Sequence, residues 1–204
     1  MVMAALVGSI DAPESLLQGQ FGTASFKQDQ SMVNTGKQLT NTYDPKTGKG
    51  NRGTAYYQDF HLETAIVRGP FSFQAEGDIV PVSMNDGRTP IFAGGYLFMT
   101  YFLTGEHRTY DRNLALFDRI KPKHPFGFGE GKGWGAWEVA ARYSTIDLNS
   151  GPVRGGKQSD AVLGINWYLN NQAKIQFNYV HNWVDNDLIH GQFDIFETRF
   201  FIDF

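Results

Sequence analysis

The chain has 204 residues, enough for one substantial domain, and carries a formal net charge of −3 with no cysteine. This balance argues against general nucleic-acid binding, and the lack of cysteine gives slight support to a chain that crosses an oxidising compartment. Hydrophobic residues are 41% and aromatic residues 15% of the chain. Its mean hydropathy is negative, which fits a soluble protein but also a transmembrane barrel, whose strands are apolar on one face only.

Residues 1–53 are polar and weakly patterned beyond an apolar first stretch. We expect loops here, with room for one strand at Gln20–Lys27. Asp29–Gly53 is rich in Gly, Asn, Thr and Lys, which predicts a loop. The first ten residues are too short, and lack the basic residue, for a signal peptide of the usual form.

From residue 54 the sequence alternates apolar and polar residues in segments of about ten residues, which predicts β-strands because a helix would mix the two sets. Strands of about ten residues are long enough to cross a bilayer at a tilt, whereas soluble strands usually have about five or six. The expected strands are Phe60–Arg68, Phe71–Val80, Phe92–Thr104, Trp134–Leu148, Asp160–Asn170, Ala173–Trp183 and Phe193–Phe204.

Turn residues separate these segments. Gly69-Pro70, Asn85–Gly87 and Asn170-Asn171 predict tight turns, and Asn149–Lys157 predicts a longer Gly/Pro loop. Gly105–Lys132 is a long connection with several apolar residues. If the C-terminus is periplasmic, counting strands back places this connection on the periplasmic side, where turns are normally short. We therefore expect this connection to fold into the lumen and narrow the pore. The expectation is wrong if the connection extends into solvent or contains an extra strand pair.

The alternation also assigns faces. In the last strand, Phe196, Thr198, Phe200, Ile202 and Phe204 fall on one side, and Glu197, Arg199 and Asp203 fall on the other. Phe92–Thr104 is apolar on both sides, and we assign Leu97, Met99, Tyr101 and Leu103 to the lipid side. With aromatic residues near strand ends, these features predict an all-β fold: an antiparallel transmembrane β-barrel of the outer-membrane type, here with seven or eight strands.

Several long motifs occur in an order that carries a family resemblance. They are YFLTGEHRTYDR at 101–112, RIKPKHPF at 119–126, GWGAWEVAARYS at 133–144, DAVLGINWYLN at 160–170 and DIFETRF at 194–200. Together they resemble the C-terminal part of the phosphate-selective porin O and P family. The resemblance runs from about Asp59 to Phe204 and is not visible over residues 1–53.

The resemblance implies a sixteen-stranded barrel in the outer membrane of a Gram-negative-type bacterium, trimeric in its full-length form, which passes small anions such as phosphate or polyphosphate. Seven or eight strands are about half of such a barrel. We therefore expect a fragment in which residues 54–204 are the C-terminal portion of the porin barrel. Phe204, with Ile202 and Phe200, resembles the signal that the outer-membrane assembly machinery reads.

Anion selection needs fixed positive charge in a narrow path. The lumen-side basic residues are Arg142, Lys174 and Arg199, and the connection adds Arg119, Lys121 and Lys123. Arginine suits phosphate because its planar fork can donate two hydrogen bonds at once. The alternative is that these residues form ordinary salt bridges with acids on the same side, which are Glu63, Glu76, Glu138, Glu197 and Asp203.

Other motifs indicate no catalytic, cofactor or metal site. Gly151–Gln158 imitates a phosphate-binding loop but has Gln158 where Ser or Thr should stand, and a strand follows it. The calcium-like stretch from Asp185 has Phe196 at its twelfth position. The five histidines are scattered, and no nucleophile motif surrounds any serine, although Ser144 and His181 are the pair that an outer-membrane lipase or acyltransferase would need.

We therefore expect a passive diffusion channel for small anions, without a cofactor or catalysis, in contact with the lipid bilayer and not with nucleic acid. Two alternatives remain at this stage. One is a small eight-stranded outer-membrane barrel with a structural or adhesive role. The other is a soluble ligand-binding β-barrel.

Overall fold

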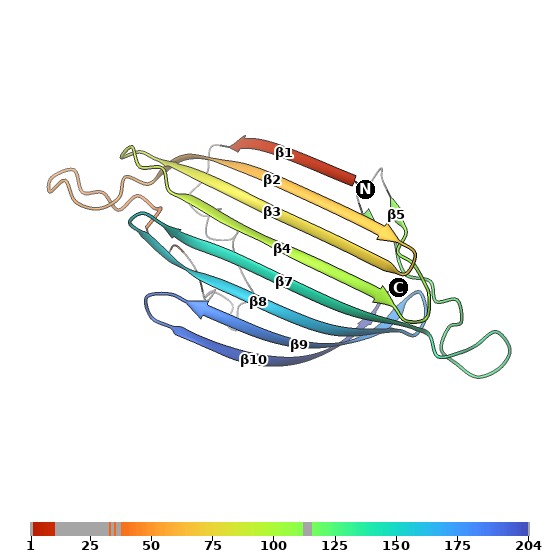
Figure 1. The fold of residues 1–204 in the computed structure, drawn as a ribbon. Helices are drawn as coiled ribbons and strands as arrows, with labels where there is room; N and C mark the ends of the chain where they lie inside the picture. Colours follow the sequence, from red (N-terminus) through yellow and green to blue (C-terminus); the bar gives the residue numbers. More distant parts are fainter. Residues whose placement is uncertain (1, 11–32, 34, 36–37, 112–115, 204) are drawn as a thin grey trace.

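The computed structural model describes residues 2–10, 33, 35, 38–111 and 116–203. Eight strands form one antiparallel sheet in the order β1-β2-β3-β4-β7-β8-β9-β10, and β5 and β6 form a separate pair (Figure 1). The main strands are β1 (Val2–Ile10), β2 (Thr54–Arg68), β3 (Phe71–Met84), β4 (Ile91–Phe102), β7 (Ala136–Ser150), β8 (Val153–Tyr168), β9 (Ala173–Asp185) and β10 (His190–Ile202). The short strands are β5 (Tyr110–Asp111) and β6 (Leu116–Phe117).

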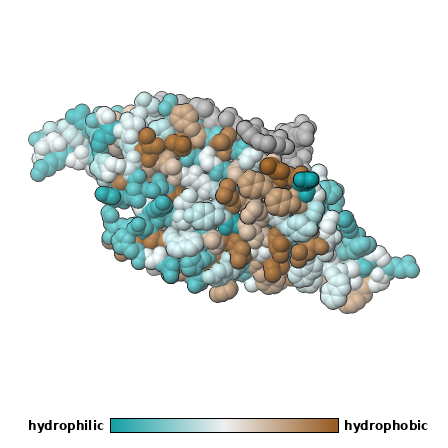
Figure 2. Space-filling view, viewed as in Figure 1, coloured by the Kyte–Doolittle hydropathy of each residue, from teal (hydrophilic) through white to brown (hydrophobic). Residues whose placement is uncertain are grey.

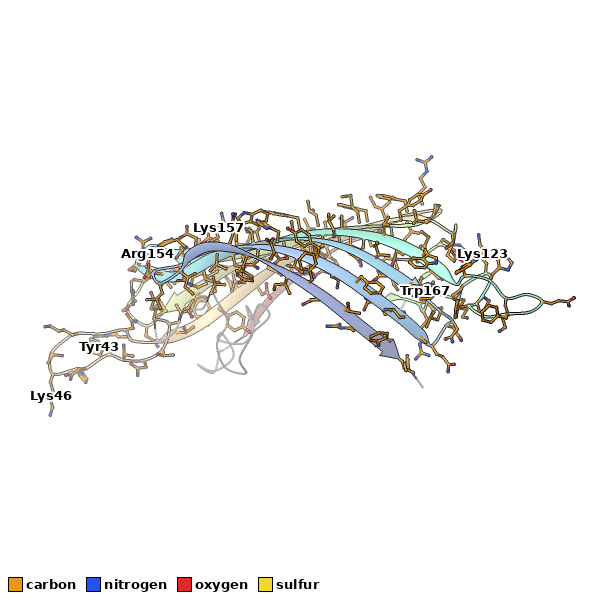
Figure 3. The ribbon with its side chains drawn as sticks, turned by 90° about the horizontal axis from the view of Figure 1, so that it is seen from below. Tyr43, Lys46, Lys123, Arg154, Lys157 and Trp167 are labelled. Atoms are coloured by element: carbon orange, nitrogen blue, oxygen red, sulfur yellow. The ribbon has the colours of Figure 1, made fainter. Side chains whose placement is uncertain are left out.

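The all-β prediction and the seven expected strands are confirmed. Strands β2 to β4 and β7 to β10 each have between 12 and 16 residues, well above the usual length of a strand in a soluble domain. The sheet arches strongly when it is seen along its edge (Figure 3). Its strand order is open, with β1 and β10 at the two edges. No helix in the described residues is long and apolar enough to cross a membrane.

The eighth strand differs from the expected one. Val2–Ile10 pairs with β2, from Val2 opposite Ala65 to Ile10 opposite Tyr57. Its sequence is a short apolar run without clean alternation, so the periodicity did not mark it as a strand. The strand that we placed at Gln20–Lys27 lies outside the described residues.

The prediction of a loop at Asn149–Lys157 is wrong. Gly151 and Pro152 alone form the turn, and β8 begins at Val153. The Gly-rich composition is explained by the backbone: Gly156 has a φ of 90°, and a Cβ there would lie 2.7 Å from Cβ of Asn186. Glycine therefore permits a close approach of two neighbouring hairpins at this point, and does not mark an irregular loop.

The two ends of the sheet carry different connections. We call the end with both termini the terminal rim; it holds the Gly69–Pro70 turn, the 103–135 connection and the 169–172 turn (Figure 1). We call the other end the loop rim; it holds the connections at 11–53, 85–90, 151–152 and 186–189. This alternation agrees with the order of connections expected from the sequence.

The two faces of the sheet separate large apolar side chains from charged ones. We call the face that carries Leu97, Met99, Phe196 and Phe200 the apolar face; Phe196 and Phe200 are 82% and 73% exposed. Figure 2 shows it from the front, with hydrophobic residues over its middle and hydrophilic ones gathered toward both ends. The opposite, polar face carries Phe92, Thr100 and Phe102, all nearly fully buried. The exposure in β4 matches the register chosen from the sequence.

At the loop rim the polar face is covered by an apolar cluster. It consists of Val33, Leu39, Tyr57, Val80, Val82, Met84, Phe92, Ile146, Leu148, Val153 and Val184. Val33 and Leu39 lie between β1 and β2 in the sequence, so described residues of this segment cover this end of the face. Gln38 fastens it there, because its amide donates to the Arg154 carbonyl oxygen at 3.0 Å and its amide oxygen accepts from the Arg154 N–H at 2.7 Å.

Candidate pore-lining face

The polar face between the two rims is acidic where β2 and β3 meet. His61 Nδ1 lies 2.5 Å from Asp78 Oδ1, and Glu63 stands directly opposite Glu76 across the two strands. Asp59 is half-buried on the same face, one position closer to the loop rim. Like charges opposite each other in a ladder repel, so this side of the face attracts cations or stays strongly hydrated.

A tyrosine links the acidic strands to the basic part of the face. The Tyr96 hydroxyl on β4 donates to Glu76 Oε1 at 2.5 Å. The Arg142 guanidinium on β7 lies over the Tyr96 ring, 4.5 Å from its centroid. Arg142 is therefore held against an aromatic face by a cation–π contact.

The other two predicted strand cations lie on β9 and β10. Lys174 is half-buried, with its ammonium 5.6 Å from the centroid of Tyr168 and 5.2 Å from that of Phe201. Arg199 is exposed one strand away, opposite Gln176. Within the described part of the chain, Arg142, Lys174 and Arg199 have no carboxylate within ion-pair distance, so the salt-bridge alternative is not observed for them there.

Arg108 is a polar-face cation that the sequence reasoning missed. Its Nη2 lies 2.6 Å from Glu138 Oε1, and Glu138 is fully buried. Asn166 Nδ2 and the Tyr168 hydroxyl donate to the other carboxylate oxygen at 2.8 and 2.9 Å. From the sequence, Glu138 is predicted only as a partner for the strand cations; its complete burial, which requires a cation close by, is seen only in the structure.

The long connection lies partly on this face and partly beyond the rim. Ile120 is buried against Phe102, Ala136 and Tyr168 on the polar face, and Arg108 reaches Glu138. The connection also contains the β5–β6 pair, which the expectation of a plain inward-folded segment excluded. That expectation is therefore wrong in this respect: β5 pairs with β6 inside the connection, while Arg108 and Ile120 on either side of this pair contact the sheet.

The three predicted cations of the connection have different surroundings. Arg119 is ion-paired with Asp203, which is the salt-bridge alternative. Lys123 donates from Nζ to the Gly105 carbonyl oxygen at 2.7 Å, at the terminal rim (Figure 3). Lys121 is exposed. The structure thus groups Arg119 with the polar face, and leaves Lys121 and Lys123 toward the solvent at the rim.

Aromatic side chains mark the terminal rim of the apolar face. Trp137 and Trp167 stack with centroids 5.0 Å apart, and Phe126 meets Trp167 edge-on at 5.1 Å. Trp134 is exposed beside them and its carbonyl oxygen accepts from Trp167 Nε1 at 2.6 Å. Tryptophans with one polar end and an apolar body suit the boundary between lipid and water.

The residues that an enzyme would need are on opposite faces. Ser144 lies on the polar face and donates to Asp160 Oδ2 at 2.6 Å. His181 lies on the apolar face, 2.6 Å from Asp194 Oδ1. The sheet separates them, so they do not form a nucleophile–base pair. Across the described residues no group of three His, Cys, Asp or Glu side chains is arranged to hold a metal ion.

The predicted assembly signal is visible only in part. Phe200 and Ile202 project from the apolar face of β10 and are 73% and 64% exposed. Phe204 lies outside the described residues. The two visible residues have the exposure that a lipid-facing stripe requires.

Comparison with known proteins agrees with this geometry. The family model described as phosphate-selective porin O and P matches residues 20–204, so the family extends further toward the N-terminus than the resemblance from Asp59 suggested. The chain is 36% identical over 147 residues to Porin O of Pseudomonas aeruginosa, covering 65% of this chain and 32% of that protein. It is 35% identical over 120 residues to an uncharacterized protein of Caulobacter vibrioides, covering 59% of this chain and 23% of that protein.

The chain thus spans about a quarter to a third of the length of these curated relatives. The family match, by contrast, covers most of the chain and includes all seven strands from β2 to β10 in the main sheet. The long antiparallel strands, the segregated faces and this match lead to one conclusion. The chain belongs to the phosphate-selective porin O and P family.

Proposed function

We propose that this chain forms part of the wall of an outer-membrane porin that passes small phosphate-like anions by passive diffusion. Family membership implies the bacterial outer membrane and favours a channel over an enzyme. The proposal assigns the apolar face to lipid and the polar face to the lumen. One observation carries the anion preference: Arg142, Lys174 and Arg199 line the polar face without a carboxylate at ion-pair distance among the described residues.

Charge is unevenly distributed along this wall. Asp59, Glu63, Glu76 and Asp78 lie on β2 and β3, whereas the cations without a described carboxylate partner lie on β7, β9 and β10, next to fewer acids, such as Asp160 and Glu197. An anion that enters such a lumen is drawn to the β7–β10 side, because opposite charges on two sides of a narrow pore produce a field across it. The anion path therefore follows Arg142, Arg199 and Lys174 toward the terminal rim.

The open sheet needs further strands to span a membrane. The outer edges of β1 and β10 pair with no described strand, and lipid does not tolerate unpaired backbone groups. We propose that additional strands close the sheet into a barrel of about sixteen strands, of the porin type, and that the complete protein is a homotrimer. The assembly machinery would read the end of β10, so deletion of Phe204 is expected to reduce insertion into the outer membrane.

The test is an electrical measurement on the complete barrel. The protein is reconstituted in a planar bilayer and the reversal potential is measured in a salt gradient. An anion-selective sign supports the proposal, and addition of phosphate should reduce the chloride current because phosphate occupies the same cations. A cation-selective sign contradicts the anion preference, and a bilayer that stays non-conducting contradicts the channel itself.

A further inference from the structure

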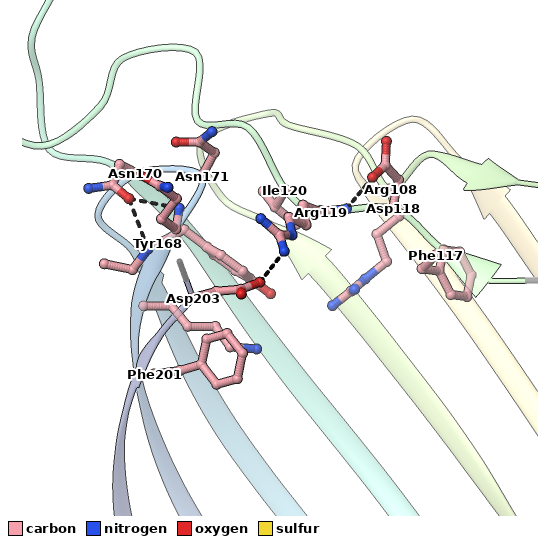
Figure 4. A pocket seen from close by; sticks show the side chains of 13 residues that line it. Arg108, Phe117, Asp118, Arg119, Ile120, Tyr168, Asn170, Asn171, Phe201 and Asp203 are labelled. Carbon is pink, nitrogen blue, oxygen red and sulfur yellow. Dashed lines mark hydrogen bonds and ion pairs between the residues drawn. The ribbon is translucent and has the colours of Figure 1, made fainter.

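A pocket opens on the polar face where the long connection meets the terminal rim (Figure 4). It has a volume of about 280 Å³ and is formed by segments that are far apart in the sequence. The connection contributes Arg108, Phe117, Arg119 and Ile120. The ends of β8, β9 and β10 contribute Tyr168, Lys174 and Phe201, Asp203 follows β10, and the β8–β9 turn adds Asn170, Asn171 and Gln172.

The cations of this pocket are not equivalent. Arg108 is paired with buried Glu138, and Arg119 is paired with Asp203. Lys174 has no carboxylate at ion-pair distance among the described residues; its ammonium lies near the rings of Tyr168 and Phe201, with the charges of Arg108 and Glu138 farther away. A half-buried ammonium without a carboxylate is the group that an incoming anion can neutralise, since the two arginines already have anionic partners.

The remaining wall combines polar residues, among them Asp118, Asn170 and Gln172, with an apolar part. In the apolar part Phe201 is 45% exposed although it lies on the polar face, and Phe117, Ile120 and Tyr168 line the same pocket. Inorganic phosphate gains little from this apolar part, because it is strongly hydrated and has no apolar surface to bury. A molecule with one anionic group and a ring-sized apolar body can place the anion at Lys174 and the body against Phe201.

We infer that this pocket binds small organic anions, of the aromatic phosphate-ester or aromatic carboxylate class, in preference to inorganic phosphate. The inference rests on the proposed function, because it names a substrate class for the same lumen. It adds a selective binding step at Lys174, where the path along Arg142 and Arg199 reaches the terminal rim.

The test compares phenyl phosphate with inorganic phosphate, two anions of similar charge that differ in the ring. Their affinities for the detergent-solubilised protein are measured by titration calorimetry, with protein-free micelles as the control for partition of phenyl phosphate. Phenyl phosphate is expected to bind about tenfold more tightly, the gain from burying roughly half a ring. Equal affinities overturn the inference.

Two pairs of variants locate the binding. Phe201→Leu should remove most of the preference for phenyl phosphate, whereas Phe200→Leu, the same change on the apolar face, should leave it intact. Lys174→Met should weaken both anions, whereas Lys46→Met at the far loop tip should weaken neither (Figure 3). If Phe201→Leu behaves as Phe200→Leu does, the pocket is not the site.

The outcomes separate this inference from the channel. Binding of phenyl phosphate at Lys174 and Phe201 without conductance supports the inferred binding site and contradicts the proposed channel function. Anion-selective conductance with no preference for phenyl phosphate supports the channel function and overturns the inference that the pocket selects organic anions.

Discussion

Arg108 and Glu138 join the long connection to the polar face through an ion pair with 2.6 Å between Nη2 and Oε1. Glu138 is fully buried and accepts two further hydrogen bonds, from Asn166 and Tyr168. The pair fixes the start of the connection against β7 and thereby shapes one side of the pocket that also contains Lys174 and Phe201.

Arg108→Met should destabilise the protein by about 3–5 kcal/mol, because it leaves the Glu138 carboxylate buried without its cation. The free energy of unfolding is measured by urea titration of the protein in lipid vesicles. Arg68→Met, at the exposed end of β2 on the same rim, is the matched control and should have little effect. Equal effects of the two substitutions would show that the buried pair contributes nothing specific.

Leu163→Lys should impair membrane insertion by about 2–4 kcal/mol, since it places a charge on the lipid-facing side of the sheet. Leu163 is 61% exposed on the apolar face near the middle of β8. Ile195→Lys makes a comparable change on the polar face beside Glu197 and should be tolerated. The measurement is the fraction of heat-modifiable, folded protein on gels after insertion into vesicles; the opposite ranking would invert the assignment of faces.

Arg142→Gln should move the reversal potential of the complete channel toward cation selectivity, because it removes a lumen cation that has no described carboxylate partner. Glu63→Gln removes a charge of opposite sign from the same face and should move the potential the other way. Both shifts should be larger at 0.1 M than at 1 M salt, where the Debye length falls from about 10 Å to about 3 Å. Shifts of the same sign would place neither residue in the ion path.

Gly135→Ala should destabilise the protein more than Gly151→Ala, although both glycines have positive φ, 72° and 56°. The φ alone costs an alanine about 1–2 kcal/mol at either position. At Gly135 the added Cβ also meets the Tyr168 carbonyl oxygen, so the backbone must shift, whereas at Gly151 it meets open space. The midpoints of urea unfolding compare them, and equal losses would contradict the close approach at Gly135.

Asp86 should give the β3–β4 turn a pH-dependent contribution to stability. Arg88 donates from Nε and Nη2 to the Asp86 carboxylate and holds the pKa of that carboxyl below its ordinary value of 3.8. The contribution is therefore present above the ordinary pKa and is lost as the pH falls through the lowered value. The same guanidinium donates to Asn51 Oδ1 at 2.7 Å, so protonation of Asp86 should also loosen the connection before β2.

The Asp86 titration is measured by carboxyl-carbon NMR in Asp-labelled protein, with Arg88→Gln as the comparison. The Asp86 resonance should titrate at lower pH in the parent protein than in Arg88→Gln. Identical titration midpoints would show that the pair does not favour the ionised carboxylate.

The sequence by itself determined the strands and the faces of most of the sheet. The alternation from Phe60 onward predicted seven strands, and the exposure of Leu97 and Met99 on the face opposite Phe102 agrees with the chosen register. This information is local, because side chains of a strand alternate with a period of two whatever the strand pairs with. The short turns at Gly69 and Asn170 were predictable for the same reason.

Only the tertiary structure decided which distant segments meet. The pairing of β1 with β2, the burial of Glu138 under Arg108 and the gathering of Arg119, Lys174 and Phe201 into one pocket have no local pattern that marks them. Each depends on a partner many residues away, whose position is set by the stacking of intervening strands and by the return of the long connection to the polar face. The alternation placed Arg142, Lys174 and Arg199 on the same face as in the structure, and the fold decided that Arg108 and Arg119 have carboxylate partners.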